Sequence, residues 1–101
     1  MFVHAVYFWL RPDLSEADRV TFTAWMPRLC ALPSVASGHW GVPAPTDRPV
    51  IERTYSYALV LLFTDGGAEE SYQVDAEHDA FRAECASFWT KVQIFDSEPP
   101  A

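Results

Sequence analysis

The stretch YSYALVLLFT, residues 55–64, decides the predicted fold, because it is apolar on both sides of an extended chain. Side chains along a strand alternate between the two faces of a sheet. One face would carry Tyr57, Leu59, Leu61 and Phe63, and the other would carry Ala58, Val60 and Leu62. The stretch therefore predicts a central strand whose two faces both require cover.

Three further segments predict strands. Residues 2–10, FVHAVYFWL, are β-branched and aromatic, and both alternating sets are apolar except for His4. Residues 34–42, SVASGHWGV, predict a weaker strand, and residues 91–96, KVQIFD, predict the last one. Residues 43–53 contain three prolines and predict a loop, because proline cannot donate a ladder hydrogen bond.

A first helix is predicted after Ser15, which is a typical N-cap residue. Pro27 predicts a kink or a restart near Trp25-Met26, because a proline inside a helix costs about 3 kcal/mol. Pro33 should end the element. Apolar residues recur near the helical period at Val20, Phe22, Trp25, Met26, Leu29 and Leu32.

A second helical region follows the central strand in two pieces. The turn Asp65-Gly66-Gly67 leads into a short helix over 68–74. Asp75 is a plausible cap for a second piece over 76–88. The apolar contacts of that piece are expected from Ala80, Phe81, Cys85 and Phe88.

The order β-α-β-β-α-β predicts one α+β domain over residues 1–101, with a ferredoxin-like antiparallel sheet of four strands. Such a sheet carries helices on one face only, so its other face should be polar if it meets water. Here the other face is apolar, and a patch of that size is a liability in a monomer. We therefore expect a homodimer in which two sheets pack face to face.

Composition excludes several classes of protein. The formal net charge is −7, and the seven basic residues form no run, which argues against nucleic acid and anionic membranes. The longest apolar run, 57–63, is too short to span a bilayer, and the N-terminus lacks the pattern of a signal peptide. Cys30 and Cys85 have no CxxC spacing and are expected to be free thiols in a cytoplasmic protein.

The segment SYQVDAEHDAF, residues 71–81, carries the candidate chemistry. Tyr72 and His78 flank the expected cap Asp75, so a break in the chain could bring them over one cavity. The helix dipole disfavours a protonated His78, whereas the neighbouring carboxylates favour it, and the sequence leaves this balance open. A neutral His78 could accept a proton while Tyr72 orients a substrate oxygen. Alternatively, His78 is a half-exposed residue bonded to a carboxylate.

His4 and Tyr57 are expected on the face of the sheet that looks towards the helices. His4 is either a hydrogen-bonded core residue or part of a ligand site, and Tyr57 is expected to meet it across the sheet. With Phe81, these residues are the candidates for binding a substrate. The three histidines show no H-x-x-x-H spacing, and no phosphate loop or dinucleotide motif is present, so no metal or cofactor is expected.

The sequence resembles the stress-responsive A/B barrel domain (Dabb) family, whose members form dimeric α+β barrels. Four segments carry the resemblance: VHAVYFWLRPDLSEAD, YSYALVLLF, YQVDAEHDAF and SFWTKVQIFD. The ending is similar to that of a plant polyketide cyclase of the family, in which a His/Tyr pair is implied in an aldol-type ring closure without cofactor or metal. The positions that match its site are His4, Tyr72 and His78, whereas Tyr57 stands where the cyclase has histidine.

A second departure is the sequence Asp75-Ala76-Glu77-His78, which stands where the family carries H-P-x-H. Membership of such a family indicates the fold more strongly than the activity. Three functions therefore stay open. They are a binding protein of unassigned activity for a small apolar or aromatic molecule, a cofactor-independent enzyme that transfers protons with His78 and Tyr72, and a purely structural stress-associated dimer.

Overall fold

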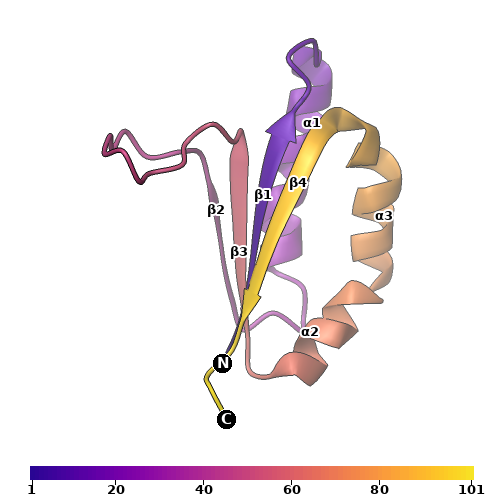
Figure 1. The fold of residues 1–101 in the computed structure, drawn as a ribbon. Coiled ribbons are helices and arrows are strands. Elements are labelled where there is room, and N and C mark those ends of the chain that lie inside the picture. The colour runs from indigo at the N-terminus through magenta and orange to yellow at the C-terminus, as the bar shows by residue number, and fades with distance from the viewer.

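The computed structural model describes residues 1–101 and shows a four-stranded antiparallel sheet covered by helices on one face (Figure 1). The strands lie side by side in the order β2-β3-β1-β4, which is the ferredoxin-like α+β arrangement that the sequence predicts. In chain order the elements are β1 (Phe2–Leu10), α1 (Glu16–Cys30), β2 (Ser37–Gly41), β3 (Tyr57–Phe63), α2 (Gly66–Gln73), α3 (Ala76–Cys85), the 3₁₀ turn η1 (Ala86–Phe88) and β4 (Trp89–Ser97).

The core lies between the helices and one face of the sheet. In β1, every second residue from His4 onwards is buried, and the residues between them are only half-buried. The register places Val6 between Leu59 of β3 and Ile94 of β4, so the same face continues across three strands. The core is formed by Val6, Phe8, Leu10, Leu14, Phe22, Trp25, Met26, Leu29, Leu32, Leu59, Leu61, Phe63, Tyr72, Phe81 and Cys85.

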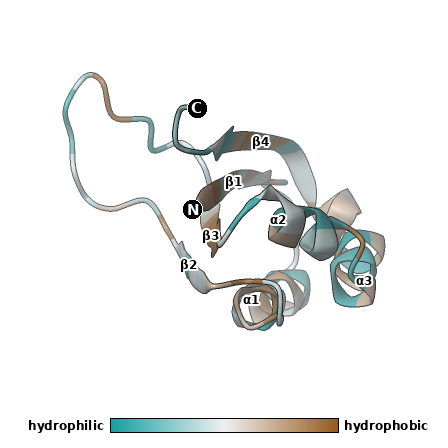
Figure 2. Cartoon of the chain, turned by 90° about the horizontal axis from the view of Figure 1, so that it is seen from below, coloured by the Kyte–Doolittle hydropathy of each residue, from teal (hydrophilic) through white to brown (hydrophobic).

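The opposite face of the sheet, here called the outer face, has no helix over it (Figure 2). Val60 and Leu62 are half-buried there, and Phe95 is 60% exposed. Residues 42–56 leave the sheet on this side and reach away from the body of the domain. A hollow of about 470 Å³ on this face is lined by Tyr7, Trp9, Glu52, Tyr55, Lys91, Gln93 and Phe95.

Helix α1 begins as predicted, runs through Pro27 without a restart, and ends at Cys30, before Pro33. The Ser15 hydroxyl accepts a hydrogen bond from the backbone N–H of Asp18 at 3.1 Å and caps the helix. The expected restart at Pro27 is wrong, because Met26 and Leu29 on its two sides are fully buried in one core that holds the helix together. Val20 is exposed, since it lies half a turn out of phase with Leu29.

Helices α2 and α3 both begin at an aspartate. Asp65 accepts a hydrogen bond from Ala68 N–H at 2.9 Å, so α2 begins before the predicted residue 68. Asp75 caps α3 as predicted, through Glu77 N–H at 2.8 Å. The predicted helix over 76–88 is too long, because Arg11 N–H donates to the carbonyl of Phe88 at 2.9 Å and ties that segment to the end of β1.

Strand β2 is shorter than the predicted 34–42 and packs closely against α1. A Cβ atom placed on Gly38 would lie 2.6 Å from Cys30 Cβ and 2.9 Å from Cys30 Cα, so only glycine fits at this crossing. The loop predicted over 43–53 falls within the irregular residues 42–56. No helix of the chain combines the length and the apolar character that crossing a bilayer requires.

Candidate functional site

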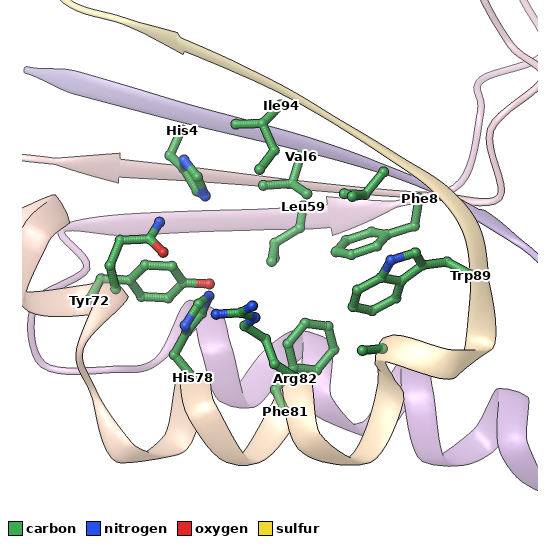
Figure 3. A pocket seen from close by; sticks show the side chains of 13 residues that line it. His4, Val6, Phe8, Leu59, Tyr72, His78, Phe81, Arg82, Trp89 and Ile94 are labelled. Carbon is green, nitrogen blue, oxygen red and sulfur yellow. The ribbon is translucent and has the colours of Figure 1, made fainter.

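A cavity of about 420 Å³ lies between the inner face of the sheet and helices α2 and α3 (Figure 3). Nine of its thirteen lining residues are hydrophobic, and none is a carboxylate. The polar groups lie in the part of the cavity nearer α2, and they come from β1, α2 and α3 (Figure 3). The lining consists of His4, Val6, Phe8, Leu59, Tyr72, Gln73, His78, Phe81, Arg82, Ala86, Trp89, Val92 and Ile94.

The break between α2 and α3 brings Tyr72 and His78 together. Val74 ends α2 and Asp75 begins α3, so the chain changes direction between the two residues. Their ring centroids lie 4.7 Å apart, and both side chains are buried. The Tyr72 hydroxyl makes no hydrogen bond with the chain and points towards His78 and Arg82 (Figure 3). A phenol and an imidazole therefore face the same space.

Burial keeps both groups in their neutral forms near neutral pH. The pKa of Tyr72 is raised well above its usual value, first by burial and then by the nearby Cys30, Glu69 and Asp75. The pKa of His78 is lowered, first by burial and next by the positive charge of Arg82, with Asp79 opposing the change. The resulting pair is a neutral imidazole, able to accept a proton, beside a protonated phenol, able to donate a hydrogen bond.

The Nδ1 atom of His78 makes no hydrogen bond of ordinary geometry and is shielded from solvent. The Gln73 backbone, at the end of α2, still favours the protonated ring, although less than burial and Arg82 disfavour it. An imidazole nitrogen without a close partner is costly to bury. It is also the kind of unsatisfied group that gathers at ligand sites.

His4 is fixed by a carboxylate at the end of β4. The register pairs His4 of β1 with Asp96, and His4 Nδ1 donates to Asp96 Oδ1 at 2.6 Å. This bond assigns the Nδ1–H tautomer to a neutral ring and leaves Nε2 as an acceptor. The His4 ring also lies 5.8 Å from the Tyr72 ring. His4, Tyr72 and His78 therefore form a continuous row at the α2 end of the cavity, from the sheet to α3 (Figure 3).

The structure brings together four of the five residues that the sequence singles out. His4, Tyr72, His78 and Phe81 all line the cavity. Tyr57 does not, and its expected meeting with His4 is wrong. The register places Tyr57 opposite Phe8, whereas His4 pairs with Leu61 four residues along β3.

The Tyr57 ring instead packs against Phe22 and Trp40, with ring centroids 5.5 Å and 6.3 Å apart, at the end of the sheet away from His4. Three polar residues were missed by the sequence reasoning: Gln73 and Arg82, which line the cavity, and Asp96, which bonds His4. Arg82 lies one helical turn after His78, so the helical period could have found it. Finding Asp96 required the β1–β4 register, which depends on pairing between strands far apart in the sequence.

No cluster of three or more His, Cys, Asp or Glu side chains is arranged to hold a metal ion.

Comparison with known families gives a match over almost the whole chain. A family model described as "Stress responsive A/B Barrel Domain" matches residues 2–99. No curated protein matches the sequence.

Solved structures share the fold at low identity. A Dabb family protein with a ferredoxin-like fold from Mesorhizobium loti has a TM-score of 0.77 at 20% identity, and the match covers 99% of this chain and 97% of that one. A dimeric ferredoxin-like protein of unknown function from Thermobifida fusca has a TM-score of 0.76 at 16% identity, over 95% of this chain and 88% of that one. A hydroxynitrile lyase from Passiflora edulis has a TM-score of 0.76 at 16% identity, over 95% and 90%. At these identities the likeness shows the fold.

Proposed function

The chain belongs to the stress-responsive A/B barrel domain family, and from this premise we propose that it binds a small apolar or aromatic molecule in the cavity between the sheet and α3. The observation that carries the proposal is the cavity itself. Its volume of about 420 Å³ lies in the range of small-molecule sites, which are mostly apolar with a few convergent polar groups. A purely structural role would instead call for a filled core.

Binding can be tested with 2-naphthol, a neutral aromatic probe, by isothermal titration calorimetry. Ala86 lines the cavity and is exposed, so Ala86→Trp should fill the space without disturbing the core. Val20→Trp is the matched control, because Val20 is an exposed residue of α1 outside the cavity. We expect Ala86→Trp to weaken binding by about tenfold or more, a loss of about 1.4 kcal/mol. Equal affinity in both variants, or no binding to the wild type, would refute the proposal.

The protein is further proposed to act in the cytoplasm as a homodimer that buries the outer face. Val60, Leu62 and Phe95 leave an apolar surface there, which two-fold packing of two sheets would cover. The Thermobifida fusca protein of the same fold is described as dimeric. Cys30 and Cys85 are free, in keeping with a reducing compartment.

The dimer can be tested by light scattering coupled to gel filtration. The wild type should have twice the mass of the chain, and Val60→Lys should have the mass of one chain. Val50→Lys is the control, because Val50 is an exposed valine in the segment 42–56 rather than on the sheet. A wild type that elutes with the mass of a single chain at micromolar concentration would contradict the dimer.

A second candidate function is proton transfer, which is favoured by the neutral His78 beside Tyr72. The imidazole nitrogen facing the cavity would take a proton from the carbon next to a carbonyl of the bound molecule. The electron pair of the broken C–H bond would form the enolate, and the Tyr72 hydroxyl would donate a hydrogen bond to the enolate oxygen. The fold is compatible with catalysis in general, since the Passiflora edulis protein is a lyase.

Proton transfer predicts that the protein speeds deuterium uptake from D₂O into an aryl methyl ketone, measured by NMR. His78→Gln should abolish the effect, and Tyr72→Phe should reduce it by about 10²–10⁴-fold, the usual contribution of acid–base groups. His39→Gln is the control, because His39 is exposed on β2 away from the cavity. Ketone binding without any exchange would leave the binding function standing and remove the enzymatic one.

A further inference from the structure

Arg82 has no partner in the protein. Its side chain makes no ion pair, although three other arginines pair with carboxylates at 4.0 Å or less. The tightest of these pairs joins Arg28 Nη2 at 2.6 Å to Oε2 of Glu77, which lies on the same helix as Arg82. Arg19 and Arg48 are also without ion pairs, but neither lines the cavity. Arg82 is thus the one arginine that is both unpaired and part of the site.

A carboxylate was available to Arg82 on its own helix. Asp79 lies three residues earlier on α3, a spacing at which opposite charges commonly pair. No such pair is present, and the guanidinium points into the cavity beside His78 and Tyr72 (Figure 3). The Arg82 charge is felt there, because it lowers the pKa of His78. The unpaired charge of Arg82 therefore acts on the cavity.

The rest of the cavity offers nothing to neutralise this charge. No Asp or Glu lines it, although the chain as a whole carries a formal net charge of −7. Asp96 is held by His4, and Tyr72 and His78 are neutral near neutral pH. An apolar chamber with a single guanidinium matches a molecule with an apolar body and a single anionic group.

We propose that Arg82 binds the carboxylate of the ligand, so that the natural ligand is a carboxylic acid whose aromatic or aliphatic body fills the cavity. This inference rests on the proposed binding function and narrows its ligand class. The guanidinium fork fits a carboxylate with two parallel N–H···O bonds. Arg82 is an exposed residue that also lines the cavity, so the acid group lies at the mouth while the body lies inside, against Phe81 and Trp89.

The test uses 6-phenylhexanoate and 6-phenylhexanamide, which share a body and differ in charge. Their affinities for the full chain are measured by isothermal titration calorimetry at low ionic strength. The wild type should bind the acid about tenfold more tightly than the amide, in keeping with a charged hydrogen bond at a partly exposed site. Arg82→Gln should bind the two probes equally, because the charge that distinguishes the acid from the amide is gone. Arg19→Gln removes the same charge outside the cavity and should keep the preference.

The outcomes separate the two proposals. If the wild type binds acid and amide equally, or if Arg82→Gln keeps the preference, the assignment of Arg82 is overturned and the binding function stands. If neither probe binds to any variant, the binding function and the assignment fall together. Circular dichroism spectra of the variants should superimpose, because both substituted side chains lie outside the buried core.

Discussion

Gly38→Ala tests the close approach of α1 and β2. The added Cβ would lie 2.6 Å from Cys30 Cβ, which is 0.8 Å nearer than the 3.4 Å at which ordinary contact begins. It would also lie 2.9 Å from Cys30 Cα, so rotation of a side chain cannot relieve the overlap. Strand β2 would have to move away from α1. Overpacking of this kind costs about 1–3 kcal/mol.

Urea denaturation monitored by circular dichroism measures the cost, and the midpoint of thermal unfolding should fall by about 4–8 °C per kcal/mol. All variants are compared at one protein concentration, since a dimer's stability depends on it. Gly41→Ala is the matched control in the same strand. Its Cβ would meet only the His39 side chain at 3.5 Å, and neither glycine has a positive φ.

Alanine should therefore be neutral or stabilising at Gly41, by about 0.5–1 kcal/mol, because it loses less backbone entropy on folding than glycine. Cys30→Ala in the Gly38→Ala background removes the overlap with Sγ at 2.7 Å but keeps the overlaps with the backbone and Cβ of residue 30. Most of the destabilisation should remain in this double variant. Equal stabilities of Gly38→Ala and Gly41→Ala would refute the claim that the crossing requires glycine.

Three further predictions concern buried groups of the site and the core. Because the folded chain holds the pKa of His78 below the ordinary value of about 6.5, the unfolded chain binds more protons as the pH falls, and stability should decrease from about pH 6.5 downwards. His78→Gln should flatten this part of the pH profile measured with urea, and an unchanged slope would contradict the low pKa. Asp96→Ala should lower the free energy of unfolding by about 1–3 kcal/mol, because it leaves the buried His4 Nδ1–H without its partner. Asp47→Ala is the control, since it breaks an exposed pair with Arg53 at 3.8 Å and should cost about 0–1 kcal/mol. Equal losses of stability in urea titrations would argue against a special role for the His4 bond. Burial raises the pKa of Cys85 to about 11, so in the folded protein Cys85 should react with an aromatic disulfide reagent at pH 8 far more slowly than in urea, and equal rates would show that it is not shielded.

The strands and the helix starts were predictable because each depends on local chemistry. The doubly apolar segment 55–64 could only be a covered strand, and it contains β3. Ser15 and Asp75 cap the two longer helices through hydrogen bonds that span two or three residues. The ends of elements were less predictable. The predicted helix over 76–88 stops at Cys85, and Phe88 at its predicted end is bonded instead to Arg11, which is far away in the sequence.

The site was predictable to the extent that it lies within one segment. Tyr72, Asp75 and His78 are close in sequence, and the cap between them explains why the two rings meet. Tyr57 was assigned to the site on face parity alone. Parity gives the side of the sheet on which a residue lies, and the strand register gives its position along it. Asp96, the partner of His4, was not found for a similar reason, because its position depends on the β1–β4 register.

The junction between α2 and α3 determines how Tyr72 and His78 lie relative to each other. Tyr72 and His78 belong to different helices, each begun by its own aspartate, whereas strands β1, β3 and β4 supply the opposite wall of the cavity. Inserting or deleting a residue near Val74 would change the position of the His78 imidazole relative to the Tyr72 phenol, and it would leave the pairing of the strands unchanged. Related chains that differ in this short junction would therefore accept different substrates, while the strands keep the same fold.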